Sequence, residues 1–380
     1  MPILVDSTMS KSAGMGAYHY ATLFTVGNYG VRKLSRLGSL IMKKGKKHLY
    51  LCVSCLILFA ASLMPSACGP SSKPIEASGF YFDTVIRITL YDSSRQDALN
   101  HCMELAERYE RYFSATLPDS DISRINVNPN RPVKVHKETA ELIQKGLDYG
   151  RLSDGQFDIT IGKVSSLWDF HTEGIHTLPK TSSIKKSLKH VDYRQVHVSG
   201  NTVTLQDPDS AIDVGGIAKG YIADRMKVYL KKEGITAGLI NLGGNVLTLG
   251  EKPDHKPYTI GIQKPFSDDG TPALTLKIRN RSVVTSGTYQ RYFLHKDNLY
   301  HHILDTSTGY PCQNDLNSVT IISKSSTDGD ALSTMVFLMG LKKGMQFVES
   351  KDNIEAVFIT KDGQIHYSAG FGIKIPFKEY

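Results

Sequence analysis

The segment Asp213–Gly220, with the sequence DVGGIAKG, decides the fold around it. It leads directly into a helical pattern from about Ile217 to Gly234, so the chain passes from a strand into a helix on two adjacent glycines. Segments with strand composition follow at 237–249, 258–263 and 274–285. Because these strands succeed one another without a regular alternation of strand and helix, the pattern predicts an α+β protein.

The rest of the chain fits that class. Apolar residues at helical spacing predict a helix over 95–113. Helices are also expected over 139–152, ended by Asp154-Gly155, and over 328–339. β-Branched and aromatic composition predicts strands at 79–91, 195–205, 291–304, 317–323 and 354–375. Two polar segments are expected outside these elements, a loop over 114–126 and a surface excursion over 171–190.

The positive charge of the chain is concentrated near its N-terminus. The formal net charge is +8, but the first 67 residues hold eight of the 45 Lys and Arg and only one of the 37 Asp and Glu. The remainder has 37 basic and 36 acidic residues. A body this close to neutral lacks the basic surface that nucleic-acid binding requires, so we expect no nucleic-acid partner.

That basic segment has the order of a secretory signal. The lysines of 43–47 precede an apolar run from Leu49 to Met64, and small residues lead to Cys68. The segment Ser66-Ala67-Cys68 resembles a bacterial lipoprotein cleavage site, although Pro65 stands where an aliphatic residue is usual. We therefore expect an upstream extension at 1–41, a signal peptide at 42–67, a linker at 68–78 and the folded domain at 79–377. Lipidation of Cys68 would anchor the protein to the cell membrane, facing outside the cytoplasm; simple secretion is the alternative.

The DVGGIAKG turn has the features of an anion site. Free backbone N–H groups at a helix start point toward an anion, and glycines let a phosphate approach the backbone closely. Lys219 adds a positive charge. The glycine spacing matches neither the P-loop nor the dinucleotide fingerprint. The alternative is an ordinary tight turn with a surface lysine.

A second group lies in Asp330–Thr334, with the sequence DALST. On a helix Asp330 and Thr334 occupy the same face, one turn apart. A carboxylate and a hydroxyl suit a hard cation that takes oxygen ligands, which favours Mg²⁺. Alternatively, Asp330 complements the dipole of a helix start and Thr334 is an ordinary helix residue.

A third group lies in Tyr300–Gly309, with the sequence YHHILDTSTG. Adjacent histidines on a strand face opposite sides, so one metal ion cannot easily take both. An inward histidine with Asp305 nearby suits proton transfer or contact with a phosphate. The alternative is a half-buried histidine satisfied by its neighbours.

Together these segments resemble the FAD:protein FMN transferase family, the ApbE-type flavin transferases. The resemblance spans about residues 79 to 370 and rests on blocks in family order, which are 79–84, 119–126 (DSDISRIN), 154–161 (DGQFDITI), 213–220, 241–245 (NLGGN), 286–293 (SGTYQRYF), 302–311 (HILDTSTGYP) and 330–334. It implies a two-lobed α+β domain with the flavin site between the lobes, and FAD and Mg²⁺ as substrate and metal.

The resemblance also implies roles for individual residues. Asp330 and Thr334 match side-chain Mg²⁺ ligands, and Gly216 matches a position that offers its carbonyl to the metal, where Ser or Ala is more usual. His302 and Asp305 match the segment near the reacting phosphates, with His302 as the candidate base and Asp305 orienting it. Thr306 replaces a common proline. The positions that match FAD contacts are Asp213, Lys219, Phe157, Asp158, Ile159, Leu304, Phe82 and Thr116, of which the last two differ in residue type from the family.

The expected reaction is transfer of the FMN part of FAD to a Ser or Thr hydroxyl of an acceptor flavoprotein, with release of AMP. The nearest alternative is an Mg²⁺-dependent FAD pyrophosphatase, in which water replaces that hydroxyl. Two further alternatives are a flavin-binding lipoprotein without catalysis and an electron-transfer flavoprotein. An intact metal site favours an enzyme over a simple binding protein.

Overall fold

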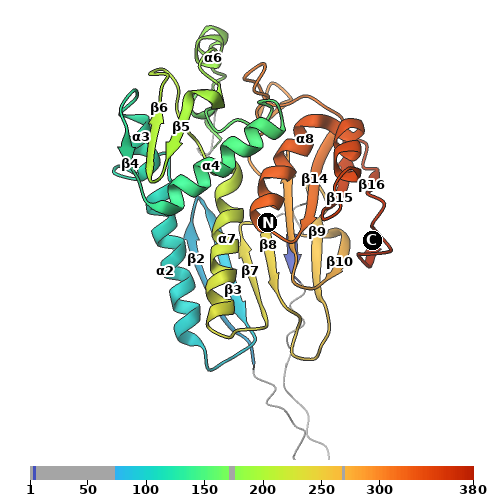
Figure 1. The fold of residues 1–380 in the computed structure, drawn as a ribbon. Coiled ribbons are helices and arrows are strands. Elements are labelled where there is room, and N and C mark those ends of the chain that lie inside the picture. Colours follow the sequence, from blue (N-terminus) through green and yellow to red (C-terminus); the bar gives the residue numbers. More distant parts are fainter. Residues whose placement is uncertain (1–2, 6–72, 171–175, 268–269) are drawn as a thin grey trace, which may run out of the picture. The chain divides into compact units, whose positions relative to one another are not determined.

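The computed structural model describes residues 3–5, 73–170, 176–267 and 270–380 (Figure 1). Cys68 and the predicted signal peptide lie outside these ranges, so their assignments stay predictions. Helices and strands alternate irregularly, and every pair of neighbouring strands is antiparallel. The predicted α+β class is therefore confirmed.

An eight-stranded sheet forms the centre of the fold. Its order is β16-β15-β14-β11-β8-β7-β3-β2. In chain order its strands are β2 (Ile75–Tyr81), β3 (Thr84–Leu90), β7 (Gly238–Leu242), β8 (Asn245–Leu249), β11 (Ser282–Gly287), β14 (Leu316–Ser323), β15 (Glu355–Thr360) and β16 (Ile365–Tyr367).

Both faces of this sheet are buried. Successive side chains of a strand point to opposite faces, so neighbouring residues belong to different cores. Ile240, Leu247 and Ile321 belong to a core shared with helices. Their chain neighbours Leu239, Val246 and Ile322 belong to a second core on the other face. Strands covered on both sides become continuous apolar runs, which explains why the sequence shows little alternation there.

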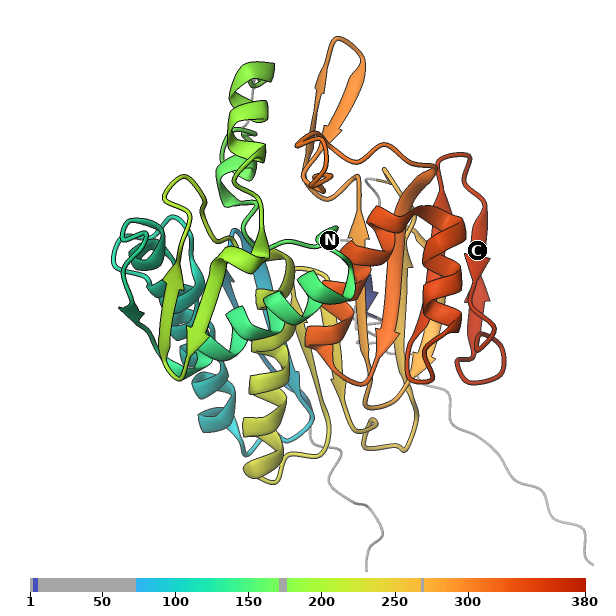
Figure 2. The same cartoon turned by 45° about the horizontal axis from the view of Figure 1, so that its top comes forward.

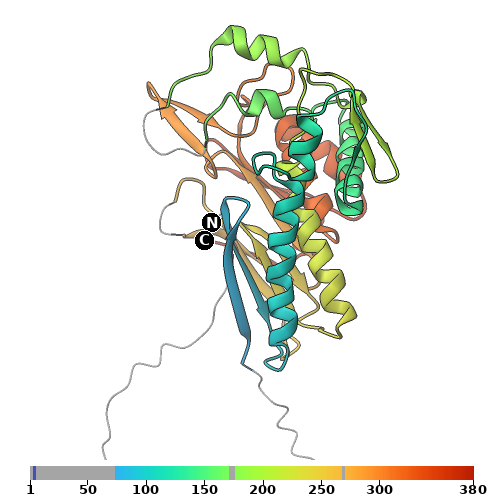
Figure 3. The same cartoon turned by 90° about the vertical axis from the view of Figure 1, so that its left-hand side faces the viewer.

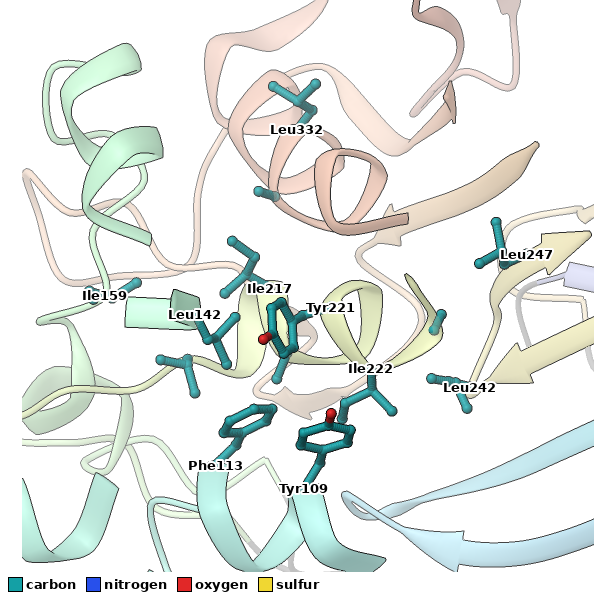
Figure 4. Packing of buried hydrophobic residues seen from close by; sticks show 14 of the residues in the cluster. Tyr109, Phe113, Leu142, Ile159, Ile217, Tyr221, Ile222, Leu242, Leu247 and Leu332 are labelled. Carbon is teal, nitrogen blue, oxygen red and sulfur yellow. The ribbon is translucent and has the colours of Figure 1, made fainter. Parts of the chain in front are cut away.

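Three long helices cover one face of the sheet (Figures 1 and 3). They are α2 (Gln96–Phe113), α7 (Gly215–Lys232) and α8 (Ser326–Glu349). Tyr109 and Phe113 of α2 stack at 5.3 Å between ring centroids and meet Tyr221 of α7 edge to face (Figure 4). The start of α7 is therefore held between α2 on one side and α8 on the other.

The other face packs against a four-stranded sheet of order β1-β9-β10-β17. Its strands are β1 (Ile3–Val5), β9 (Tyr258–Gln263), β10 (Pro272–Ile278) and β17 (Phe377–Glu379). Tyr258 and Ile260 of β9 lie in the core between the two sheets. The protein is thus layered as helices, large sheet and small sheet.

The remaining elements lie toward one end of the large sheet (Figure 2). They are α3 (Asp121–Asn126), β4 (Val133–Lys134), α4 (Lys137–Leu152), α5 (Gly162–Ser165), α6 (Thr181–Leu188), a short 3₁₀ turn (Tyr193–Gln195), β5 (Val196–Ser199), β6 (Thr202–Leu205), β12 (Tyr292–His295) and β13 (Asn298–His301). Strands β4, β6 and β5 form a three-stranded sheet, and β12 and β13 form a separate hairpin. No helix in the described ranges is both long and apolar enough to cross a membrane.

Several sequence predictions were wrong in detail. The expected surface excursion over 171–190 contains helix α6, and the segments expected as strands at 195–205 and 291–304 are the hairpins β5–β6 and β12–β13. The expected single strand over 79–91 is a hairpin, β2–β3, that turns at Phe82 and Asp83, whose φ angles are 53° and 54°. Two successive residues with positive φ make a tight hairpin turn, even without the glycine or asparagine that usually marks one. The expected loop over 114–126 contains helix α3, because the hydroxyl of Ser120 caps its start by accepting the N–H of Ser123 at 2.9 Å.

Candidate active site

The start of α7 and the first turns of α8 are in direct contact, and Gly220 permits that contact. A Cβ at this position would lie 2.7 Å from the carbonyl carbon of Ser326 and 2.8 Å from the Cβ of Asp330. The backbone N–H of Gly220 instead donates to Asp330 Oδ2 at 2.8 Å. The glycine therefore brings a carboxylate of one helix against the backbone of the other.

Asp330 is a buried carboxylate with few protein partners. This residue is 5% exposed, and its carboxylate contacts the Gly220 N–H, the Asn245 side chain and the Lys219 ammonium, whose Nζ lies 3.7 Å from Oδ1. Burial raises the pKa of Asp330, while Lys219 and the Gly220 N–H oppose that rise. A buried carboxylate with only one distant cation is suited to binding another.

The other predicted metal ligands are near this carboxylate. In an α-helix the Gly220 N–H lies about 3 Å from the carbonyl oxygen four residues earlier, which is that of Gly216. Because the same N–H reaches Asp330, the Gly216 carbonyl and the Asp330 carboxylate lie within about 6 Å of each other. Thr334 follows Asp330 by one helical turn on the same face. The three predicted oxygen donors thus lie on two helices that are in contact, and their common binding of one ion stays a prediction.

The hydroxyl of Thr334 is held by a residue that sequence analysis did not assign. Ser286 Oγ on β11 lies 3.1 Å from Thr334 Oγ1 and 2.8 Å from Ser333 Oγ. Asn245 at the start of β8 is a second such residue: its Oδ1 accepts from Ser326 Oγ at 2.6 Å, and its side chain helps to lower the pKa of Asp330. Both residues belong to the blocks NLGGN and SGTYQRYF, so their position in those blocks was the available signal.

The predicted anion site at the start of α7 is present only in part: Lys219 lies there, but no strand in the described ranges leads into the helix, and the N–H groups of Ile217 and Ala218 bond to the Val214 carbonyl at 3.0 and 2.9 Å. Asp213 accepts the Gly215 N–H at 2.8 Å through Oδ1, and Ser165 Oγ lies 3.2 Å from its Oδ2. Lys219 Nζ donates to the Gly215 carbonyl at 3.2 Å. The lysine therefore lies over the first turn of the helix and close to Asp330, where it can contact an anionic ligand.

The surroundings of His302 orient its ring and keep it neutral. Its Nδ1 lies 3.2 Å from the Arg291 carbonyl oxygen, so we assign the ring proton to Nδ1 and the lone pair to Nε2. Burial lowers the pKa of His302 to about 3, and the nearby charge of Arg291 adds to that effect. Burial also lowers the pKa of His301 to about 4, and the Nε2 of His301 is bonded to the Cys312 carbonyl at 3.1 Å.

Asp305 has other partners than the one expected. Its Oδ1 accepts from the N–H and the hydroxyl of Ser307, at 2.7 and 2.6 Å, within the loop that follows Leu304. In the described ranges the partner of the His302 ring is the Arg291 carbonyl, so the backbone orients this histidine. Among the described residues no direct contact joins Asp305 to His302, so the predicted orientation of His302 by Asp305 has no support in this structure.

The block Phe157–Ile159 forms a buried turn beside α7. Phe157 lies under Gly216, since a Cβ there would be 3.2 Å from its ring. Asp158 accepts from Thr160 N at 2.8 Å and Tyr193 N at 2.8 Å, and burial raises its pKa. Ile159 lies in the helix-side core (Figure 4). These contacts order the turn, and the predicted contacts with the flavin stay predictions.

The other predicted flavin contacts are spread over three segments. Phe82 is at the β2–β3 turn, where its N–H donates to Glu110 Oε1 at 2.6 Å. Thr116 is exposed in the loop after α2, with its hydroxyl 3.1 Å from Ser114 Oγ. Leu304 is buried in a small core with Trp168 and Phe293. The backbone of Phe82 contacts the residue that orients His302, because the Arg291 guanidinium donates to the Phe82 carbonyl at 3.3 Å.

A family model described as the ApbE family matches residues 82–358. The chain belongs to the ApbE family. A protein named FAD:protein FMN transferase from Klebsiella pneumoniae is 39% identical over 288 residues, which cover 75% of this chain and 88% of that protein. One of the same name from Treponema pallidum is 31% identical over 326 residues, covering 80% of this chain and 90% of its own length.

Solved structures of the family have the same fold. The ApbE protein of Thermotoga maritima superposes with a TM-score of 0.72 at 31% identity, covering 78% of this chain and 97% of that one. The flavin transferase ApbE of Vibrio cholerae gives a TM-score of 0.69 at 26% identity and covers 78% of this chain and 97% of its own.

Two other features of the described residues do not coincide with this site. The first is a cavity of about 380 Å³ that touches Asp158 and Asp305 but neither Asp330 nor Lys219. Its carboxylates, which include Asp154 and Asp192, would repel the negative charge of a pyrophosphate. A group of His190, Asp207 and Asp209 has metal-ligand types, but His190 Nδ1 already lies 2.8 Å from Asp207 Oδ2. The oxygen donors at the α7–α8 contact remain the better match to Mg²⁺.

Proposed function

We propose that this protein transfers the FMN part of FAD to a Ser or Thr hydroxyl of an acceptor protein, releasing AMP with the help of Mg²⁺. The observation that carries the proposal is the buried Asp330 carboxylate of α8, which accepts the Gly220 N–H near the start of α7, on the helix that also holds Gly216 and one turn before Thr334. The names of relatives that match over most of their length support the same reaction.

The residues at the α7–α8 contact fit Mg²⁺. All three donors are oxygens, as a hard cation prefers, and Asp330 is too buried to carry its charge without a partner. When bound, the ion would polarise the phosphate oxygens and offset their charge. Asp330, Thr334 and the Gly216 carbonyl would hold it.

The chain's own residues account for binding, charge and proton movement. The start of α7 and Lys219 stabilise the negative charge that develops on the leaving AMP. The acceptor hydroxyl oxygen forms a bond to the FMN phosphorus as the bond from that phosphorus to the AMP oxygen breaks. The hydroxyl proton passes to Nε2 of His302, which the Arg291 carbonyl keeps correctly oriented through Nδ1. The products are an FMN phosphodiester on the acceptor and AMP.

We further propose that the protein is a lipoprotein attached through Cys68 to the outer side of the cytoplasmic membrane or a comparable envelope face; cleavage before Cys68 would remove β1, an edge strand of the four-stranded sheet. The basic, apolar and small-residue order of the leader supports this. Replacing Cys68 with Ser should move the protein from the membrane to the soluble fraction. Retention of the variant on membranes after a high-salt wash would contradict the anchor.

The test of the reaction uses the full chain purified in detergent, with FAD, Mg²⁺ and an acceptor protein, and reads the intact mass of the acceptor. A gain of one FMN less one water, with an equal amount of AMP, would establish the transferase. AMP and free FMN from FAD, with no acceptor modified in an extended panel, would instead establish a pyrophosphatase. Bound flavin without AMP release would indicate a flavin-binding protein.

A further inference from the structure

The hairpin β12–β13 projects from the fold beside the candidate site (Figures 2 and 3, orange). Tyr292 pairs with His301 and His295 pairs with Asn298. The two residues between the strands, Lys296 and Asp297, have φ angles of 49° and 63°, as in a tight two-residue turn. The hairpin is a two-stranded sheet of its own, so each of its strands has an open edge.

The two faces of the hairpin have different surroundings. Phe293 points inward and packs with Tyr300, Phe170 and His176 at ring distances of 5.4, 5.6 and 4.2 Å. Its neighbours Tyr292 and Leu294 point the other way and are 42% and 64% exposed. The outer face is thus apolar and solvent-exposed, while the inner face fixes the hairpin in place.

Phe266 extends this outer face. It is 43% exposed, and its ring meets that of Tyr292 edge to face at 5.5 Å. Its φ of 57° is rare for an aromatic residue, so the local backbone holds a strained conformation that keeps the ring beside Tyr292. Tyr292, Leu294 and Phe266 together form an apolar patch, which we call the hairpin patch.

The backbone of β12 is open at the same residues. The His302 N–H bonds to the Arg291 carbonyl at 3.1 Å, so Arg291 is one of the residues that face β13. Because alternate residues of an antiparallel ladder face the partner strand, Tyr292 and Leu294 direct their N–H and C=O groups away from it. Of the residues that the structure describes, none belongs to a strand on that side.

We propose that the free edge of β12 and the hairpin patch bind the acceptor polypeptide as an added strand. The inference rests on the proposed function, which requires a polypeptide to bring a hydroxyl to the phosphate. An extended segment would pair with the backbone of Tyr292 and Leu294, and its alternate apolar side chains would contact the patch. The occupant is therefore an extended Ser- or Thr-containing segment with apolar residues at every second position near the hydroxyl.

The connection between this edge and the site supports that occupant over any other protein. The Arg291 carbonyl at the base of β12 holds the candidate base His302, and the Arg291 guanidinium donates to the carbonyls of Phe82 and Asp83 at 3.3 and 3.4 Å. Leu294 lies three residues along the strand from Arg291, which is about 10 Å. A segment added to β12 would therefore run alongside Arg291, whose carbonyl orients His302 on the opposite side of the strand.

The experiment uses the full chain in detergent with FAD, Mg²⁺ and a pool of twelve-residue peptides, each with one central Thr and randomised flanks. FMN-modified peptides are quantified and sequenced by mass spectrometry, and AMP is measured with and without peptides. We expect modified peptides to be enriched in alternating apolar residues. The double variant Tyr292→Lys/Leu294→Lys should lower peptide modification about tenfold or more, as loss of central contact residues does in other interfaces.

The matched control is Val228→Lys, which adds a lysine at a 61% exposed apolar residue of α7 away from the hairpin. It should modify peptides like the unaltered chain, and all variants should release AMP into water at the same rate in the absence of peptides. Equal peptide modification by the double variant and the unaltered chain would overturn the docking proposal. So would modified peptides that show no enrichment of alternating apolar residues, or the absence of any modified peptide when the chain does split FAD. Absence of AMP release from the unaltered chain would instead overturn the proposed function.

Discussion

Replacing Gly220 with Ala should damage both stability and the metal site. The added methyl group would lie 2.7 Å from the Ser326 carbonyl carbon and 2.8 Å from Asp330 Cβ, whereas ordinary contacts are at 3.4 Å or more. Backbone atoms of α8 cannot rotate away, so the two helices must separate. Overpacking of this kind costs about 3 kcal/mol at the upper end of the usual range. Alanine recovers about 1 kcal/mol through helix propensity, which leaves a net loss of about 2 kcal/mol.

The same separation should reduce activity. The Gly220 N–H holds Asp330, so a shift of about 1 Å between the helices misplaces the carboxylate and can lower turnover about 100-fold. Urea unfolding measures the free energy, and an Mg²⁺ titration of AMP release measures the site. Gly146→Ala is the control for overpacking away from the α7–α8 contact, because its methyl would lie 2.6 Å from Ile159 Cγ2; it should lower stability without changing the Mg²⁺ dependence. Unchanged Mg²⁺ dependence in Gly220→Ala would refute the reasoning.

Three further predictions concern the residues around this contact. Ser286→Ala removes the hydroxyl beside Thr334 and should raise the Mg²⁺ concentration for half-maximal AMP release about threefold to tenfold. Ser286→Thr keeps a hydroxyl and should show a smaller rise, whereas an unchanged Mg²⁺ titration in Ser286→Ala would show that Ser286 does not support the metal site. Lys219→Met should lower AMP release about 100-fold or more with unchanged folding by circular dichroism, because the leaving phosphate loses its cation, and an equal rate would exclude that role. The free energy of unfolding should fall as the pH is lowered from about 6.5 toward 4, because His301 is neutral when folded and protonated when unfolded; a His301→Gln variant with the same pH slope would contradict this.

The sequence predicted the elements that carry the site better than it predicted their partners. The predicted helix over 95–113 matches α2, whose buried residues recur at helical spacing. The predicted starts of α4, α7 and α8 lie about two residues from the observed ones. The predicted end at Met339 is confirmed as the end of the first helical segment of α8, because the backbone of Gly340 is not helical and its φ is 73°. A glycine with positive φ commonly ends a helix, and the second segment that follows it was not predicted.

The contact between α7 and α8 could not have been predicted from periodicity. Asp330 and Gly220 are 110 residues apart, and their hydrogen bond depends on how two helices cross. The pairing of His302 with the Arg291 carbonyl likewise arises from the β12–β13 ladder, which the sequence suggested only as one strand over 291–304. Long-range polar contacts of this kind follow from tertiary packing, whereas residue type and helix spacing are local.

The most direct test of the account compares AMP release from FAD by the unaltered chain, Asp330→Asn and Thr334→Val over a range of Mg²⁺ concentrations. Asn is close in shape to Asp and keeps an oxygen to accept the Gly220 N–H, so folding should be retained while the charge is lost. We predict that Asp330→Asn loses about 100-fold or more of its Mg²⁺-dependent turnover and that Thr334→Val loses less. Full Mg²⁺-dependent turnover in Asp330→Asn would contradict the assignment of the metal site.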